Sequence, residues 1–284
     1  MSKKTIAFQG APGAYSDLAC RAVFPDDETL PCLAFEDVFA AVVEKRADLA
    51  MLPIENSIAG RVADVHTLLP TGQLHIVAEH FQPIVHHLLA IPGAQLKNIW
   101  KAHSHVQALA QCRLWLRQHN IQAVVKGDTA GSAAALAKTP EPDVAVIASE
   151  LAGKIYGLQS LAADIADIKG NTTRFLVLSR QEKIPAYEQG KIFVTTLVFK
   201  VRSVPAALYK ALGGFATNGI NMTKLESYLV GNFSAAQFYL DIEAHPAEER
   251  FKHAMDELKF FAESVTVLGT YAGHAERQRQ SQDG

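Results

Sequence analysis

The sequence has few cysteines, no surplus of basic residues and no long apolar run, and each shortage excludes a class of protein. Only Cys20, Cys32 and Cys112 occur among 284 residues, none in a Cys-x-x-Cys pair, which predicts buried thiols in a reducing compartment. The formal net charge of −2 disfavours nucleic-acid binding. Apolar stretches end within about ten residues, too short to span a bilayer, and the N-terminal segment lacks the apolar region of a signal peptide. We expect a cytoplasmic protein that binds neither nucleic acid nor membrane.

Two ligand signatures are also missing. The glycine-rich stretch FQGAPGAYS at 8–16 is not G-x-G-x-x-G, so a bound dinucleotide is not expected. Its backbone N–H groups offer instead a small anion site where a strand meets a helix, although such a stretch is more often only a turn. The histidines at 86–87 and 103–105 have no carboxylate or cysteine at ligand spacing. We therefore predict neither a metal nor a cofactor.

Strand-like and helix-like segments alternate over the first 180 residues, which indicates an α/β fold with mostly parallel sheets. The rhythm fails at 74–92, where two strand-like halves have little helix between them; this predicts an antiparallel pair or a crossover into a second sheet. The alternation then resumes, so we expect two lobes with a ligand cleft between them, the second lobe covering about 81–165. Strands are predicted at 5–10, 29–35, 48–56, 99–102, 121–127, 143–149, 158–165 and 173–180, and helices at 14–24, 35–47, 104–119, 129–138 and 150–157.

The composition changes after Arg180. A polar stretch at 182–191 contains Pro185 and Gly190 and reads as a linker. The segments from 192 to 273 follow the order β-α-β-β-α-β, which is the ferredoxin-like arrangement, with a hairpin turn at Gly231-Asn232. The tail at 274–284 has no apolar face and is expected to be disordered.

Short polar side chains gather where strands end or begin. Asn56 or Ser57 is expected to cap a helix, as is Thr129, and Ser104 is expected to open a helix that carries Gln111 two turns along the same face. Because these residues are mostly uncharged, they predict a site that binds a compact anion through backbone N–H groups and neutral hydrogen bonds, with no nucleophile–base pair. The candidates from these junctions and from GNTTRF at 170–175 are Glu55, Asn56, Ser57, Ser104, Gln111, Thr129, Thr173 and Arg174.

Five motifs resemble, in order and spacing, those of prephenate dehydratases: GAPGAYSDLA, LPIENSIAG, SHVQALAQC, DTAGSAA and GNTTRFLVLSR. The segment from 205 resembles the ACT regulatory domain that follows in that family, and the match covers nearly all of 4–272. No chorismate mutase-like helical segment precedes it, which predicts the monofunctional form. The resemblance implies a two-lobed, periplasmic-binding-protein-like catalytic region at 1–181, the linker at 182–191, an ACT domain at 192–273 and the disordered tail at 274–284.

The resemblance implies loss of water and CO2 from prephenate to give phenylpyruvate for phenylalanine biosynthesis. Thr173 is implied as the donor to the leaving hydroxyl, and Arg174 as a group that holds the pyruvyl carboxylate or braces the strand. Strand alternation sends these two neighbours to opposite faces, so only Thr173 is expected to meet the substrate. Glu55 is expected to orient this shell. The implied substrate contacts are Glu55, Asn56, Ser57, Ser104, Gln111, Thr129 and Arg174.

The resemblance also implies L-phenylalanine as an effector and a homodimer or homotetramer. Here Ala206 stands where the family has glycine, and Tyr228-Leu229 replace Arg-Pro, so the sign and strength of regulation stay open. The implied effector contacts are Ala207, Leu208, Asn221, Met222, Glu226 and Ser227.

Two alternatives remain from the sequence. One is arogenate dehydratase, which performs the same chemistry on the transaminated substrate. The other is a non-catalytic amino-acid-binding sensor, because the lobed region resembles periplasmic binding proteins in layout.

Overall fold

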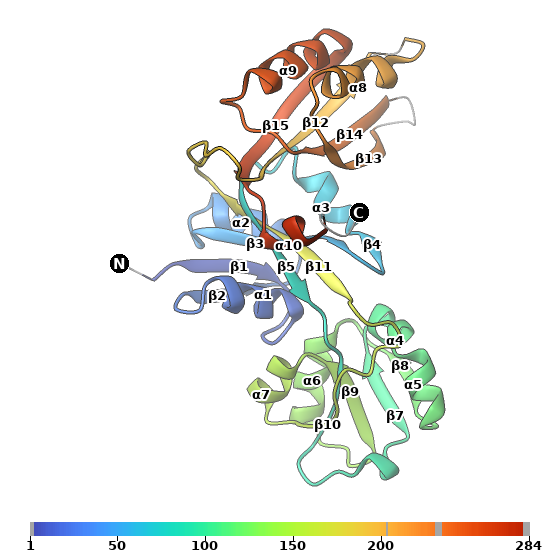
Figure 1. Cartoon of the computed structure of the whole chain (residues 1–284). Coiled ribbons are helices and arrows are strands. Elements are labelled where there is room, and N and C mark those ends of the chain that lie inside the picture. The colour runs from blue at the N-terminus through green and yellow to red at the C-terminus, as the bar shows by residue number, and fades with distance from the viewer. Residues whose placement is uncertain (1–2, 203, 231–234, 281–284) are drawn as a thin grey trace. The chain divides into compact units, whose positions relative to one another are not determined.

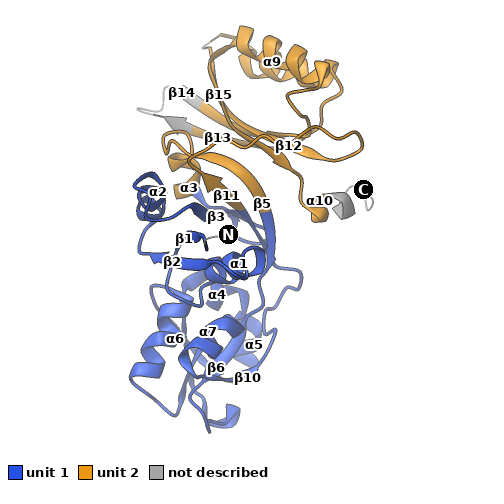
Figure 2. Ribbon diagram, turned by 90° about the vertical axis from the view of Figure 1, so that its left-hand side faces the viewer, with its two compact units in different colours: residues 1–63, 80–175 blue, residues 64–79, 176–284 orange. Residues whose placement is uncertain are grey.

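The computed structural model describes residues 3–202, 204–230 and 235–280. The chain forms two compact units (Figure 2). Unit 1 comprises Met1–Ala63 and His80–Phe175, and unit 2 comprises Asp64–Glu79 and Leu176–Gly284. Two strands, β5 (His75–Pro83) and β11 (Thr172–Ser179), pass from one unit into the other. The second lobe predicted at about 81–165 lies in unit 1, whereas the remainder of the predicted catalytic region is divided, because 64–79 and 176–181 belong to unit 2.

The first sheet has the strand order β2-β1-β3-β11-β5, with β4 paired to β3. Strand β1 pairs in parallel with both β2 and β3, as the alternation of strands and helices predicts. Residues 50–52 of β3 are fully buried, because a central strand covered on both faces needs a continuous apolar run. The elements are β1 (Thr5–Gln9), α1 (Tyr15–Val23), β2 (Glu28–Cys32), α2 (Phe35–Val43), β3 (Leu49–Asn56), β4 (Gly60–Arg61) and α3 (Ala63–Leu68).

The second sheet has the order β10-β6-β9-β7-β8. Of the two predictions for 74–92, the crossover is confirmed, because β5 belongs to the first sheet and β6 to the second. Helices α4 and α5 cover one face and α6 and α7 the other (Figure 1). The elements are β6 (His87–Ala90), η1 (Leu96–Asn98), β7 (Lys101–Ser104), α4 (Val106–Gln111), α5 (Arg113–Gln118), β8 (Gln122–Val125), α6 (Thr129–Lys138), β9 (Val144–Ala148), α7 (Glu150–Tyr156) and β10 (Gln159–Ala162).

The single helix predicted at 104–119 is two helices, broken at Cys112. The carboxylate of Asp167 accepts hydrogen bonds from the backbone N–H groups of Leu114 and Trp115. It thereby caps the start of α5 with a negative charge. The cap comes from a residue more than fifty positions away, so the helical periodicity of 104–119 could not show the break.

Unit 2 contains the predicted ferredoxin-like fold. Its four-stranded antiparallel sheet has the order β13-β14-β12-β15, and α8 and α9 pack on one face (Figure 1). The apolar residues of the two helices and of β12 and β14 form one buried core. The turn predicted at Gly231-Asn232 lies outside the described residues. The elements are β12 (Phe193–Val201), α8 (Ala207–Thr217), β13 (Met222–Val230), β14 (Ala235–Ile242), α9 (Glu249–Phe261) and β15 (Ala262–Ala272).

The prediction of a disordered tail is wrong for residues 275–280, which form helix α10 (Ala275–Gln280); residues 281–284 lie outside the described part of the chain. Arg277 forms a buried ion pair with Glu79, with Nε 2.6 Å from Oε1 and Nη2 2.9 Å from Oε2. Its Nη1 donates to Thr223 Oγ1, and the backbone N–H of His274 donates to Glu79 Oε1. Disorder was predicted because this segment has no apolar face. The ion pair between Arg277 and Glu79 anchors it instead.

The predicted state of the cysteines is confirmed: Cys20, Cys32 and Cys112 are buried and free. Burial raises the pKa of Cys112 to about 12, so its thiol is inert near neutral pH. Across 3–202, 204–230 and 235–280, no helix has the length and apolarity that crossing a membrane requires.

Candidate active site

Asn56 ends β3 and holds a tight turn together. Its Oδ1 accepts hydrogen bonds from the backbone N–H groups of Ile58 at 3.0 Å and Ala59 at 2.8 Å. The chain then enters β4, where Gly60 pairs with Asn56. The sequence predicted a helix cap at Asn56 or Ser57, and this is wrong, because the glycine-containing segment folds back as a short antiparallel strand. The Asn56 side chain caps the resulting turn.

The same side chain joins the motifs PIENS and GNTTRF. Asn56 Nδ2 donates to Thr173 Oγ1 at 2.9 Å and to Asn171 Oδ1 at 2.7 Å. Ser57 fixes the alignment, since its Oγ accepts from the backbone N–H of Thr172 and its own N–H donates to the Thr172 carbonyl. The end of β3 and the start of β11 therefore form one polar surface from segments more than one hundred residues apart.

Arg174 and Glu55 lie on the other side of these strands. Arg174 Nη1 is 3.0 Å from Glu55 Oε1, and the Arg174 side chain is only 2% exposed. Successive residues of a strand point to opposite faces, and the partners follow this rule: Thr173 meets Asn56, and Arg174 meets Glu55. The arginine therefore braces the strand end against a carboxylate.

Three residues outside the predicted set, Asn171, His86 and Tyr15, extend the polar surface, which reaches the second lobe through Gln111 and His86. Asn171 Nδ2 donates to Gln111 Oε1 at 2.9 Å, and the same oxygen is 2.7 Å from His86 Nε2. His86 Nδ1 in turn lies 2.7 Å from the Tyr15 hydroxyl. A continuous hydrogen-bond chain thus runs Tyr15–His86–Gln111–Asn171–Asn56–Thr173. Asn171 stood within the quoted motif, but only the fold brings His86 and Tyr15 to it.

The hydrogen-bond chain from Tyr15 to Thr173 carries no net charge near neutral pH. Burial is the main cause that lowers the pKa of His86, and the hydrogen bond with Gln111 opposes it. Burial also raises the pKa of Tyr15 well above its usual value, with a smaller contribution from Cys112. An imidazole whose pKa is lowered and a phenol whose pKa is raised are both neutral at pH 7. The site is therefore built from amides, hydroxyls and a neutral imidazole.

Two further predicted residues take other places. Ser104 is the last residue of β7, not the first of a helix; it is fully buried, and its Oγ donates to the Ile147 carbonyl at 2.7 Å. Helix α4 begins after His105, whose side chain is its cap. Thr129 is the first residue of α6, and the cap is Asp128, which accepts from the Gly131 N–H. Neither hydroxyl hydrogen-bonds to the Tyr15–Thr173 chain within the described ranges.

The glycine-rich stretch at 8–16 holds an anion from its own chain. The Gly13 N–H donates to Asp17 Oδ2 at 2.8 Å, and Asp17 is fully buried and paired with Arg21. The Gly13 carbonyl accepts from Ser149 in the second lobe. This turn therefore positions one lobe against the other. The Asp17 carboxylate accepts the hydrogen bond from the N–H group that was expected to bind an anionic ligand.

We predict that Gly13→Ala lowers the free energy of unfolding by about 2–3 kcal/mol. Gly13 has a φ of +87°, and an added Cβ would lie 2.7 Å from Ala152 Cα. The matched control is Gly60→Ala, since Gly60 has a φ of +81° and an added Cβ would meet nothing within 4 Å. This variant should lower the free energy of unfolding by only about 1 kcal/mol, the cost of backbone strain. Urea unfolding of both variants measures the difference; equal losses would contradict the close approach.

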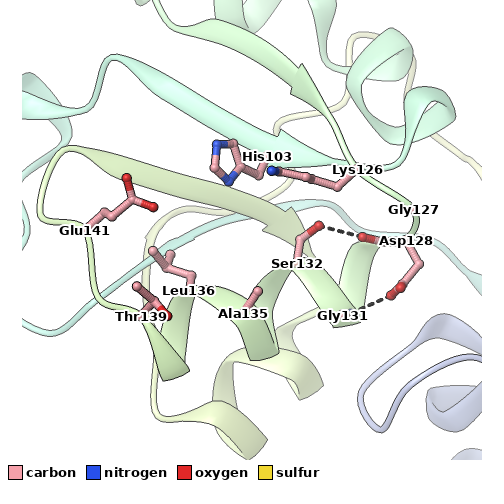
Figure 3. A pocket seen from close by; sticks show the side chains of 10 residues that line it. All are labelled: His103, Lys126, Gly127, Asp128, Gly131, Ser132, Ala135, Leu136, Thr139 and Glu141. Carbon is pink, nitrogen blue, oxygen red and sulfur yellow. Dashed lines mark hydrogen bonds between the residues drawn. The ribbon is translucent and has the colours of Figure 1, made fainter.

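A separate hollow of about 370 Å³ runs along α6 (Figure 3). His103 and Lys126 line one side, and Asp128 and Ser132 the other. His103 and Ser104 are neighbours on β7 and point to opposite faces, so this hollow lies on the other side of the sheet from α4 and Gln111. No member of the Tyr15–Thr173 chain lines it.

The predicted effector residues all lie in unit 2. Ala207 is buried at the start of α8, and Leu208 packs on the core beside it. Asn221 donates to Glu243 Oε2 at 2.9 Å and lines a hollow of about 310 Å³. On β13, Glu226 accepts from Lys224, whereas Met222 and Ser227 are exposed.

A two-lobed α/β region with an uncharged polar surface spanning both lobes is an arrangement that suits the binding of a small molecule. The family model described as prephenate dehydratase matches residues 6–183. The bifunctional N-acyl-homoserine lactone acylase/prephenate dehydratase of Komagataeibacter europaeus is 47% identical over 279 residues, which cover 98% of this chain and 99% of that protein. Arogenate dehydratase/prephenate dehydratase 1 of Arabidopsis thaliana is 41% identical, covering 95% of this chain and 72% of that protein. The crystal structure of prephenate dehydratase from Arthrobacter aurescens in complex with L-Phe superposes with a TM-score of 0.88 at 33% identity, covering 96% of this chain and 91% of that one.

The chain belongs to the prephenate dehydratase family. It is an enzyme of phenylalanine biosynthesis that removes water and CO2 from prephenate to form phenylpyruvate. The alternative of a non-catalytic amino-acid sensor is therefore set aside.

Proposed function

We propose that Thr173 donates the hydrogen bond that lets the ring hydroxyl of prephenate leave. The observation that carries this role is the direction of one contact: Asn56 Nδ2 donates to Thr173 Oγ1. The threonine oxygen is thereby an acceptor toward the protein, and its own hydrogen remains available for a ligand. A hydroxyl held near the start of a buried strand is positioned more rigidly than one on a loop.

An uncharged site suits this reaction. Decarboxylation removes the charge of the ring carboxylate, so a strong cation there would stabilise the ground state more than the transition state. The hydrogen-bond chain contains no cation, and Arg174 is paired with Glu55 on the opposite face of the strand. Aromatisation supplies the driving force, and one positioned donor at the leaving oxygen meets the remaining requirement.

We assign the other predicted substrate contacts to different roles according to their hydrogen bonds. Gln111 keeps its proposed role as a substrate contact, because only its oxygen is used in the chain and its amide nitrogen has no acceptor in the described part of the protein. Asn56 acts by orienting Thr173. We propose that Ser57, Glu55 and Arg174 support the strand ends, and we retain Ser104 and Thr129 as substrate contacts only on the family resemblance.

The substrate is tested by supplying prephenate and arogenate in parallel to the purified enzyme. The assays follow phenylpyruvate from prephenate and phenylalanine from arogenate. We expect prephenate to have the higher kcat/KM. A higher value for arogenate would replace the proposal with the alternative, which the similarity to an Arabidopsis arogenate/prephenate dehydratase supports. No product from either substrate would contradict the activity itself.

We further propose that residues 192–273 form an ACT regulatory domain that binds L-phenylalanine. The ferredoxin-like order of β12–β15 supports it, as does the relative from Arthrobacter aurescens, whose structure holds L-Phe. Asn221, Met222, Glu226 and Ser227 are the proposed contacts, with Ala207 and Leu208 at the helix start. With millimolar phenylalanine, calorimetry should show a heat of binding and thermal melting should show a higher melting temperature. Neither would be seen if the domain binds no phenylalanine.

Ala206, at the start of α8, has a φ of +59°, a left-handed conformation that costs a non-glycine residue about 1–2 kcal/mol. We predict that Ala206→Gly raises the free energy of unfolding by up to about 1 kcal/mol, because glycine's larger entropy in the unfolded chain offsets part of the relief. Ala207→Gly, one residue into the helix, is the control and should lower it by a similar amount. A loss at both positions in urea unfolding would contradict the strain at Ala206.

We also propose a homodimer or homotetramer in the cytoplasm. Strand β13 is an edge of its sheet, and an edge strand favours pairing with a second copy. Three buried free thiols fit a reducing compartment. Light scattering on the purified chain tests the assembly, and a monomer at micromolar concentration would contradict it.

A second candidate activity is hydrolysis of N-acyl-homoserine lactones. The observation that favours it is the near full-length similarity to a protein with both activities. Release of homoserine lactone from an acylated lactone tests it, and turnover that survives Thr173→Ala would indicate a separate set of catalytic groups. The monofunctional form remains the proposal if no release is detected.

A further inference from the structure

We propose that His86, held by Tyr15, is a positioning residue for the dehydratase reaction, and that as the Nε2–H tautomer it holds Gln111 in the amide orientation that continues the hydrogen-bond chain to Thr173. The inference rests on the proposed role of Thr173. It concerns two residues outside the proposed substrate contacts: His86, which no quoted motif includes, and Tyr15, which lies within GAPGAYSDLA.

The direction of the chain starts at the backbone. Asn56 Oδ1 accepts from the N–H groups of Ile58 and Ala59, and a backbone N–H can only donate. The Asn56 amide therefore has one possible orientation, with Nδ2 toward Asn171 Oδ1 and Thr173 Oγ1. Both oxygens are acceptors in these contacts.

The same logic carries the direction into the second lobe. Because Asn171 Oδ1 accepts, its Nδ2 faces Gln111 and donates to Oε1. That oxygen has no hydrogen, so the 2.7 Å contact with His86 requires a hydrogen on Nε2. A neutral imidazole then has a bare Nδ1, which accepts from the Tyr15 hydroxyl at 2.7 Å. The lowered pKa of His86 is consistent with the neutral form.

Two members of the chain keep hydrogen-bond donors that no residue in the described ranges accepts. Thr173 keeps its hydroxyl hydrogen, and Gln111 keeps its amide hydrogens. If His86 carried its hydrogen on Nδ1, the bare Nε2 would face Gln111 Oε1 across 2.7 Å, as two acceptors. The Gln111 amide would then rotate, and two donors would meet at Asn171 Nδ2. The Nε2–H tautomer of His86 therefore reinforces the orientation that Asn171 gives to Gln111, with the amide nitrogen left for the substrate.

Tyr15 explains why one tautomer prevails. Its hydroxyl has one hydrogen and two acceptors within reach, His86 Nδ1 at 2.7 Å and the Val85 carbonyl at 3.1 Å. When Nε2 carries the imidazole hydrogen, the bare Nδ1 is the nearer acceptor. The Tyr15 ring meets His86 edge-on at a centroid distance of 5.5 Å. A donor at Nδ1 selects the Nε2–H tautomer in the same way that second-shell partners orient catalytic histidines. Tyr15 comes from the first lobe and His86 from the second, so the pair also joins the two lobes near the site.

The test compares His86→Leu, His86→Gln, Gln111→Leu and the double variant His86→Leu/Gln111→Leu in the prephenate assay. We expect His86→Leu to lower kcat by about tenfold to a hundredfold, as misplaced groups do, with less effect on KM. His86→Gln returns an N–H near the Nε2 position and should stay within about fivefold of wild type. The double variant should be no slower than Gln111→Leu alone, because His86 acts through Gln111. Circular dichroism and melting of each variant measure its folded fraction.

The tautomer is read independently from the 15N shifts of His86 in histidine-labelled wild-type enzyme, with Tyr15→Phe as the comparison. Protonated Nε2 and bare Nδ1 are expected in wild type. The proposal is overturned by a hydrogen on Nδ1, by His86→Leu retaining kcat within threefold, or by losses that multiply in the double variant. If His86→Leu does not fold, a folded His86→Gln that loses a hundredfold overturns it as well. Failure of the proposed Thr173 role is distinguished by Thr173→Ala retaining activity.

Discussion

Thr173→Ala should lower kcat for prephenate by roughly a hundredfold or more, the loss expected when a positioned donor is removed. The variant removes the hydroxyl that Asn56 orients, while Asn56 Nδ2 keeps its second acceptor on Asn171. Folding should therefore change little, and the loss should lie in the chemical step. Phenylpyruvate formation at saturating prephenate measures it.

Two neighbouring variants are the controls. Thr173→Ser retains a hydroxyl and should recover most of the activity. Thr172→Ala removes a hydroxyl that donates to the Gly170 carbonyl at 3.3 Å, so we expect kcat within about threefold of wild type. If Thr173→Ala keeps normal turnover at normal folding, the assignment of Thr173 as donor is wrong.

Arg277→Met should lower the free energy of unfolding by about 3–5 kcal/mol, because it removes the guanidinium that neutralises a buried carboxylate. The Glu79 side chain is fully buried, and Arg277 supplies two of its contacts at 2.6 and 2.9 Å. We also expect proteolysis to cleave more readily within 274–280 of this variant, since the ion pair anchors α10. Urea unfolding measures the first effect, and timed digestion with proteinase K, which does not depend on the Arg277 side chain for cleavage, measures the second.

The matched control is Lys252→Met, which breaks an exposed ion pair with Glu249, with side chains 54% and 74% exposed. Such a pair contributes less than about 0.5 kcal/mol. The combined variant Glu79→Gln/Arg277→Met should recover part of the loss, since no buried charge then remains unpaired. An Arg277→Met enzyme as stable as Lys252→Met would show that the Glu79 ion pair does not hold the C-terminal helix.

The alternation of β-branched runs and amphipathic segments was sufficient to predict the α/β lobes and the ferredoxin-like unit, because burial of apolar side chains depends on local periodicity. Val38, Ala41 and Val42 lie within the helix predicted at 35–47 and are all buried on α2. The errors in the predicted starts of helices also have local causes. Ser104 and Thr129 were expected to begin or cap helices, but His105 and Asp128 are the caps, each within one residue of the prediction.

The sequence by itself determined the lobes, the ferredoxin-like order and the polar motifs, since each depends on neighbours along the chain. Only the tertiary structure decided which polar groups meet. Asn56 and Thr173 are 117 positions apart, and Glu79 and Arg277 are 198 apart. His86 lies beside a strand, where nothing in its neighbours distinguishes it, and it enters the site because the fold places Tyr15 on one side of its ring and Gln111 on the other. A hydrogen bond requires contact within about 3 Å in a fixed direction, and distance along the sequence carries no information about that contact.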